Sequence, residues 1–187
     1  MSTKNLAYVS IFAAITAVCA QIFINLPFTP VPVTLQVLAV FLSGALLGSR
    51  LGAMSQIVYL LLGAIGIPVF ASFSGGFHIL VGYTGGYLLS YPIASYLIGK
   101  ISNLYKGDSP VLKNVTTGFS MVIGLIVIYL LGASQYALVA NVSFIKSISV
   151  TVIPFIIPDL MKLLVAVALT YPVKNALLKS KLLPASN

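Results

Sequence analysis

Residues 115–138 read VTTGFSMVIGLIVIYLLGASQYAL, and this stretch decides the fold class. It carries no Asp, Glu, Lys or Arg, and the uncharged tract that contains it runs from 114 to 145. A helix that crosses a bilayer needs about 20 mainly apolar residues. Two further uncharged tracts, 5–49 and 51–99, have room for more than one such helix each. Because the apolar runs are continuous rather than alternating, they predict membrane-spanning helices.

The composition of the chain supports an integral membrane protein. Of its 187 residues, 59% are hydrophobic and only 6% are charged, whereas soluble domains carry about 25% charged residues. This composition excludes a soluble monomer and predicts a multi-pass protein of the cell membrane. The net charge of +8 comes from basic residues spread singly along the chain, so we expect no nucleic-acid partner. The single cysteine, Cys19, leaves no intrachain disulfide and no cysteine cage for a metal.

We expect one all-α domain over residues 1–187, an integral membrane bundle of six transmembrane helices. The expected spans are 6–25, 33–48, 52–66, 84–101, 115–138 and 158–178, with a short amphipathic or re-entrant piece within 140–157. Six spans put both termini on one side of the membrane. That side holds eight basic residues: Lys4, Arg50, Lys100, Lys106, Lys113, Lys174, Lys179 and Lys181. The opposite side holds Lys146 alone, so the positive-inside rule places both termini in the cytoplasm.

Two connections on the non-cytoplasmic side have unusual compositions. Residues 25–34 contain three prolines within six positions, which favours a stiff extended segment. Residues 67–83 and the start of the following span combine glycines with aromatic residues. Glycine permits tight turns and close approach of the backbone to a ligand. These features fit the rim of a binding pocket and, equally, ordinary connectors with interfacial aromatics.

The sharpest functional signal is Pro158-Asp-Leu-Met-Lys162. Proline is well placed in the first turn of a helix, and Asp159 and Lys162 then share one helix face. A charge inside a spanning segment is costly and marks a functional site by default. The pair predicts a cavity open to the outside, and a structural ion pair is the alternative. Neutral hydrogen-bonding residues lie near the same side: Thr34, Gln36, Ser72, Ser74, Thr84 and Tyr87.

Small residues and missing motifs complete the pattern. Ala13 and Ala17 belong to a stripe of small residues that lets a helix approach either a partner or a neighbouring span. Gly44, Gly48 and Gly52 form a second row, for which we expect internal packing and a turn. The sequence has no P-loop and no G-x-S-x-G or H-E-x-x-H motif, so neither ATP binding by this chain nor an enzyme is expected.

These segments together resemble the BioY family. The resemblance rests on six stretches found in order along nearly the whole chain. They are FAAITAV at 12–18, TPVPVTLQ at 29–36, GALLG at 44–48, GAIGIPVF at 63–70, GYTGGY at 82–87 and Asp159-x-x-Lys162. Members of this family are biotin-specific substrate-binding (S) subunits of energy-coupling factor (ECF) transporters.

The resemblance implies a high-affinity biotin site at the outer face of a six-helix bundle. It assigns to this site Asp159 and Lys162, Thr34 and Gln36 from the first external loop, and Gly85, Gly86 and Tyr87 from the glycine segment; Ser74 is added as a neutral group near them. It implies that Ala13 and Ala17 meet a transmembrane coupling (T) subunit powered by two cytoplasmic ATPases. ATP would be used only by those partners, and the chain would hold no metal or cofactor of its own.

Three alternatives stay open at the level of sequence. The chain could be an S subunit for another vitamin, for example a thiamine-like or pyridoxine-like compound. It could be a self-sufficient secondary transporter, although that class predicts two similar halves with broken helices. It could also be a structural assembly subunit, which would bind no ligand in the external cavity.

Overall fold

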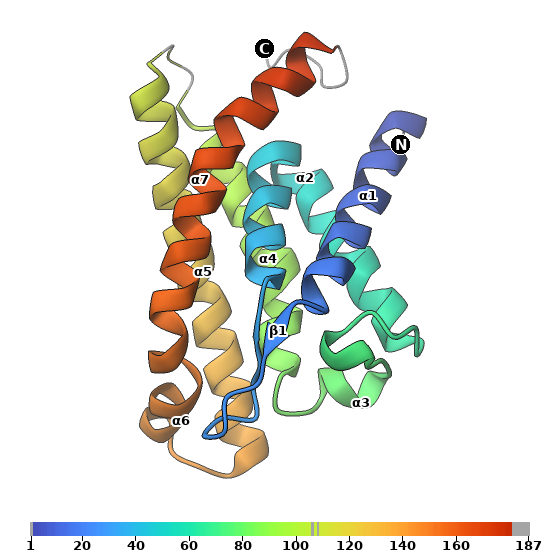
Figure 1. Cartoon of the computed structure of the whole chain (residues 1–187), viewed down its shortest axis with the longest axis vertical. Helices are drawn as coiled ribbons and strands as arrows, with labels where there is room; N and C mark the ends of the chain where they lie inside the picture. Colours follow the sequence, from blue (N-terminus) through green and yellow to red (C-terminus); the bar gives the residue numbers. More distant parts are fainter. Residues whose placement is uncertain (1, 106, 108, 181–187) are drawn as a thin grey trace.

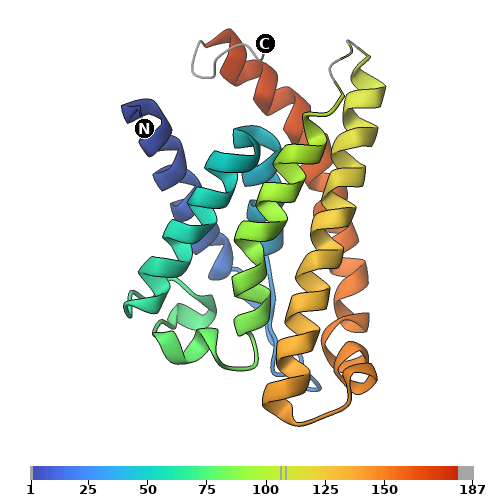
Figure 2. The same cartoon turned by 180° about the vertical axis from the view of Figure 1, so that it is seen from behind.

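Long helices run up and down one axis of the computed structural model, which describes residues 2–105, 107 and 109–180 (Figures 1 and 2). The long helices are α1 (Thr3–Ala20), α2 (Gln36–Ala64), α4 (Gly85–Ser102), α5 (Pro110–Ala140) and α7 (Ile156–Lys179). The short elements are β1 (Phe23–Ile24), β2 (Val33–Thr34), η1 (Ala71–Phe73), α3 (Phe77–Leu80), α6 (Phe144–Thr151) and η2 (Ile153–Phe155). The all-α membrane bundle predicted from the sequence is confirmed.

Helix α2 contains two passes joined without a loop. At Gly48 the backbone turns with φ of 80° and ψ of 178°, outside the helical region, and the chain runs back toward the other end of the bundle (Figure 1). The segments 36–47 and 49–64 therefore correspond to the predicted spans 33–48 and 52–66. Four helical segments of the described chain are long and apolar enough to cross a membrane: Thr3–Ala20, Gln36–Ala64, Pro110–Ala140 and Phe144–Leu177. The two passes of α2, with α4 beside them, bring the bundle to the expected six passes.

Both ends of the described chain lie at the same end of the bundle (Figure 1). The turn within α2 and the connection from α4 to α5 lie there too, whereas β1, α3 and α6 lie at the opposite end (Figures 1 and 2). The basic residues counted in the sequence thus belong mainly to one end, although Lys106 and Lys181 lie outside the described residues. Lys146, in α6, belongs to the other end.

The connection between α5 and α7 shows how local sequence sets the elements. Asn141 ends α5 in the left-handed conformation, which asparagine tolerates better than most residues. Ser143 then caps α6, because its hydroxyl accepts a hydrogen bond from the backbone N–H of Lys146. Helix α6 and η2 together form the short piece that the sequence predicts within 140–157.

The bundle closes around α4, which packs against α2 on one side and α5 on the other. Glycines make the contact with α2 close: Gly44 lies against the backbone of Ser95, and Gly52 lies against its hydroxyl. At the end of α4, Gly99 packs against the backbone of the turn at Gly48. The expected roles of Gly44 and Gly52 in packing and of Gly48 in a turn are thus confirmed.

We expect Gly44→Ala to destabilise the bundle, whereas Gly118→Ala should not. A Cβ at Gly44 would lie 2.6 Å from the Ser95 carbonyl oxygen, and relieving such overpacking costs about 1–3 kcal/mol. A Cβ at Gly118, in α5, would meet Val167 Cγ2 at 3.5 Å, an ordinary contact, and alanine favours a helix by about 0.5–1 kcal/mol over glycine. Thermal unfolding of both variants in detergent checks this, and equal midpoints would contradict the packing described.

Polar side chains buried in the middle of the bundle tie α1 to α2 and α4. The Gln56 amide nitrogen lies 3.1 Å from the Thr16 hydroxyl on α1 and 3.2 Å from the Ser43 hydroxyl. Ser43 in turn lies 2.9 Å from the Ser95 hydroxyl on α4. All four residues are fully buried, so their polar groups depend on one another for hydrogen bonds; within the described residues the Gln56 side-chain oxygen has no partner.

Candidate functional site

A cavity of about 390 Å³ is lined in large part by segments that lie at the end of the bundle opposite the termini, among them those around β2 and α3 (Figure 1). Its size is within the range of small-molecule sites. Its walls come from the segment around β2, from the connection after α2, and from α4, α5, η2 and α7. The residues that line it with polar groups are Asn25, Thr34, Gln36, Ser72, Ser74, His78, Thr84, Tyr87, Tyr91, Tyr129, Asp159 and Lys162.

The two charged residues predicted from the sequence lie together in the wall of this cavity. Lys162 Nζ is 2.6 Å from Asp159 Oδ1, and the side chains are 8% and 3% exposed. Both project from the first turns of α7, because a separation of three residues places them on one helix face. A buried charge pair needs further hydrogen bonds to satisfy its remaining groups. Lys162 keeps ammonium protons beyond the one given to Asp159, and these are available to a ligand.

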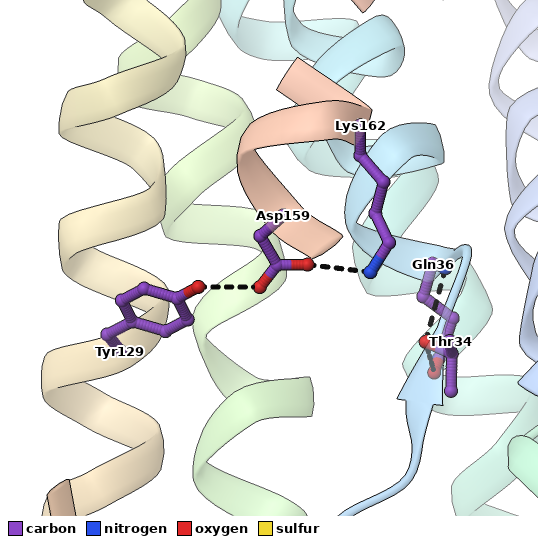
Figure 3. A network of polar contacts seen from close by, with 5 residues as sticks. All are labelled: Thr34, Gln36, Tyr129, Asp159 and Lys162. Carbon is purple, nitrogen blue, oxygen red and sulfur yellow. Dashed lines mark hydrogen bonds and ion pairs between the residues drawn. The ribbon is translucent and has the colours of Figure 1, made fainter. Parts of the chain in front are cut away.

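Tyr129 on α5 completes this cluster, and the sequence analysis missed it. Its hydroxyl donates to Asp159 Oδ2 at 2.8 Å, so that the carboxylate lies between Tyr129 and Lys162 (Figure 3). The two oxygens of Asp159 are thereby fixed in orientation by separate helices. No sequence signal could have identified Tyr129, because it lies in an uncharged apolar span, 30 residues before its partner.

A second polar cluster lies on the other side of the Lys162 amine (Figure 3). Thr34 donates to the Gln36 side-chain oxygen at 2.9 Å, and the Gln36 amide donates to the Tyr59 hydroxyl at 2.6 Å. The Tyr59 hydroxyl in turn donates a hydrogen bond to the backbone carbonyl of Val69 at 3.2 Å. Gln36 begins α2 and Thr34 ends β2, which pairs antiparallel with β1. The proline-rich segment is therefore held as part of the cavity wall.

Two more predicted site residues line the cavity with their hydrogen-bonding groups already engaged. The Tyr87 hydroxyl donates to the Thr151 carbonyl at 2.8 Å, so Tyr87 offers its ring rather than a free hydroxyl. Ser74 donates to the Ala71 carbonyl at 2.6 Å. Both residues therefore shape the cavity, and their oxygens retain only acceptor capacity for a ligand.

Gly85 and Gly86 do not line the cavity in the described structure. They lie where α4 packs against α5: a Cβ at Gly85 would meet the Leu80 carbonyl and Gln135, and one at Gly86 would meet the Leu131 carbonyl. Gln135 uses this space to donate to the carbonyls of Leu80 and Gly82. Glycines allow helices to pack closely as well as allowing the backbone to approach a ligand. At Gly85 and Gly86 the geometry favours close packing of α4 against its neighbours.

The small residues of α1 are likewise placed by packing. Ala13 is 2% exposed and belongs to the hydrophobic core, and Ala17 is half-buried against it. The geometry thus favours a neighbouring span as the contact of Ala13 and does not offer its side chain to a partner. The outer face of α1 combines small and larger apolar side chains; those exposed are Leu6, Ala7, Ser10, Ile11, Ala14, Ile15 and Val18.

The cavity is suited to binding a small molecule. It offers one ion pair, several neutral polar groups and apolar or aromatic walls from Phe70, Tyr91 and Phe155. Within residues 2–105, 107 and 109–180, no three His, Cys, Asp or Glu side chains gather to hold a metal. Such a site fits a small molecule with amide-like groups and an apolar body.

Comparisons with known proteins agree on one family. The model of the BioY family matches residues 1–179. A probable biotin transporter BioY of Pyrococcus horikoshii is 42% identical over 89% of this chain and 94% of its own length. The biotin transporter BioY of Thermotoga maritima is 41% identical over 92% of this chain and 96% of its own.

A solved structure shares the fold. It is the crystal structure of the S-component for biotin from an ECF-type ABC transporter, with a TM-score of 0.80 and 26% identity. The match covers 94% of this chain and 95% of the other. The arrangement of the helices around the cavity is therefore that of a known membrane-protein fold.

Proposed function

This chain belongs to the BioY family, and on that premise we propose that it is the biotin-binding S component of an ECF-type vitamin transporter. It is a membrane protein and not an enzyme: it captures biotin at the outer face of the plasma membrane and delivers it inward. The observation that supports this role most directly is the cavity of about 390 Å³ containing the Asp159–Lys162 pair. The cavity lies at the end of the bundle remote from the termini, which the positive-inside rule assigns to the cytoplasm.

The polar groups of the cavity match the chemistry of biotin. The ureido ring of biotin has two N–H donors and one carbonyl acceptor, and its side chain ends in a carboxylate. Asp159 accepts from a ureido N–H, and Lys162 donates to the carbonyl or the carboxylate. Thr34, Gln36, Ser74 and the ring of Tyr87 complete the walls around the ligand. Since the pair is shielded from bulk water, each of these contacts is stronger than it would be at an open surface.

The partners follow from the same proposal. A transmembrane T subunit couples this chain to two cytoplasmic ATPases, and the ATP is bound and hydrolysed by those subunits. The exposed face of α1 is the part of this chain that fits a helix of the T subunit, because its small residues allow close approach in lipid. Ala13 is buried, so it packs α1 against the rest of the bundle rather than contacting the partner.

A vitamin panel on the purified protein tests the proposed ligand. We expect biotin to bind far more tightly than thiamine-like or pyridoxine-like compounds, as measured by calorimetry in detergent. Mass spectrometry of the purified sample should also identify any vitamin that it carries. Tighter binding of another vitamin would replace biotin as the substrate, and binding of none would favour an assembly role.

Uptake in cells tests the need for the coupling subunits. Labelled biotin should accumulate when this chain is produced together with its T and ATPase subunits. Uptake should fall to background when ATP hydrolysis by those subunits is abolished. Undiminished uptake by this chain alone would instead identify a self-sufficient secondary transporter.

Tyr129→Phe should weaken biotin binding by about fivefold to tenfold. The change removes only the hydroxyl that orients Asp159, and one hydrogen bond contributes about 1 kcal/mol net, somewhat more to a charged partner. The matched control is Tyr136→Phe, also on α5, which keeps the ring contact with Tyr83. Calorimetry on both variants checks the difference, and equal affinities would show that Asp159 needs no orientation by α5.

A further inference from the structure

Gln21, at the end of α1, holds a segment that forms part of the cavity wall. Its side-chain oxygen accepts a hydrogen bond from the Phe73 backbone N–H at 2.9 Å. Its amide nitrogen donates to the Phe70 carbonyl at 3.0 Å, with the Val69 carbonyl at 3.4 Å. The amide orientation follows from these partners, because one is a donor and the others are acceptors. Gln21 is not among the described residues that line the cavity, so it contacts the wall segment on the side away from the cavity.

The segment held by Gln21 carries an unusual backbone. Ser72 and Phe73 have φ of 59° and 53°, so two consecutive non-glycine residues are left-handed. Left-handed backbone is strained for a residue with a side chain, and it persists only where the surroundings enforce it. The Phe73 N–H that Gln21 binds lies at the centre of this strained turn. Ser72 and Ser74, on either side of Phe73, both line the cavity.

Helix α1 is attached to the rest of the bundle mainly through α2. Its outer face is exposed, and Thr16 supplies its buried polar tie to Gln56. Gln21 adds hydrogen bonds of longer range, which join the end of α1 to a segment about 50 residues further along the chain. A change in the position of α1 would therefore pull on the wall at Phe70–Phe73.

We propose that Gln21 is a positioning residue that fastens the outer wall of the cavity to α1, so that the position of α1 sets how fast the ligand leaves. The inference rests on the proposed function for its ligand, biotin, and extends it by naming the link between α1 and the site. With Gln21 in place, the segment 69–74 stays closed over the cavity. Without this link, the segment opens more often, and it is then held from the inside by the Tyr59 hydroxyl on the Val69 carbonyl and by the buried Phe70 ring, which packs edge-on against Tyr59.

Gln21→Met tests this link, because methionine keeps the length of the side chain and removes its hydrogen bonds. We expect biotin to dissociate at least about fivefold faster, since the loss of even one of the hydrogen bonds to the wall would have that effect, while its association rate is not reduced. Amide hydrogen exchange of peptides covering 69–74 should accelerate, with exchange in α4 and α5 unchanged. A merely structural role would instead raise exchange throughout the bundle and lower the thermal midpoint.

The control is Ile22→Ala, at the neighbouring position, where the side chain is exposed. It should leave both rates as they are in the unaltered protein. If Gln21→Met does not fold, Gln21→Asn is measured in its place, since it keeps the amide but is too short to reach the wall. Unchanged dissociation and exchange in a folded variant would overturn the proposal. Exchange needs no ligand, so failure of the unaltered protein to bind biotin would refute the proposed function and leave this test intact.

Discussion

Replacing Lys162 alone by Met is expected to lower the free energy of unfolding by about 3–5 kcal/mol. The reason is the burial of its partner: Asp159 is 2% exposed and would be left as an uncompensated negative charge inside the bundle. Tyr129 would still donate to it, but one neutral donor does not balance a full charge. The thermal midpoint in detergent should fall by about 6 °C or more, given about 2–4 °C per kcal/mol for a chain of this size.

The double variant Asp159→Asn/Lys162→Met separates charge burial from loss of packing. It leaves no buried charge, and the amide oxygen introduced at position 159 can still accept from Tyr129, so its stability should return to within about 1 kcal/mol of the unaltered protein. Lys179→Met, at the exposed end of the same helix, controls for loss of a lysine. Equal midpoints for the single variant and the control would mean that water reaches Asp159.

The same double variant is expected to bind biotin at least about thirtyfold more weakly, a loss of about 2 kcal/mol. It lacks both the carboxylate that accepts from the ligand and the ammonium group that donates to it. A thermal midpoint close to that of the unaltered protein would show that its lost affinity is not due to unfolding. Calorimetry on the purified protein measures the loss, with Lys179→Met expected to bind normally.

Normal binding by the double variant would give a different assignment. Asp159 and Lys162 would then be a structural pair that joins α7 to α5, and the ligand contacts would fall to the cluster of Thr34 and Gln36. Family membership would be unaffected, because it rests on the whole chain. The two measurements, stability and affinity, thus test the two interpretations that the sequence alone left open.

The fold was largely predictable because membrane helices are marked by long uncharged tracts. Residues 51–99 and 114–145 contain no Asp, Glu, Lys or Arg, so these tracts locate the membrane-spanning parts of the chain, and hydropathy with the Pro- and Gly-rich connections divides them into spans. The turn at Gly48 was also accessible, since Arg50 interrupts the apolar run just beyond it. Helix ends were less predictable: the first span was expected to reach residue 25, but α1 ends at Ala20 and the chain then pairs as β1 with β2.

The charged part of the site was predictable because its residues are rare. Asp159 is one of two acidic residues in the chain, so its position within a span indicates a functional site. Tyr129 and Gln21 carry no such mark, because tyrosine and glutamine occur throughout the sequence and their partners lie 30 or more residues away. The roles of Gly85, Gly86 and Ala13 are hard to predict for the opposite reason: small residues serve helix packing as readily as they serve a ligand or a partner.

The turn at Gly48 is constrained by handedness alone. A methyl group there would meet only Asn103 Nδ2, at 3.5 Å, so there is room for a larger residue. The backbone angles, φ of 80° and ψ of 178°, are nevertheless closed to an L side chain, while their mirror image is ordinary extended geometry. A D-alanine introduced by chemical synthesis would fit this position without strain, and an L-alanine would not. Chirality rather than crowding therefore keeps residue 48 a glycine and lets two membrane passes join without a loop.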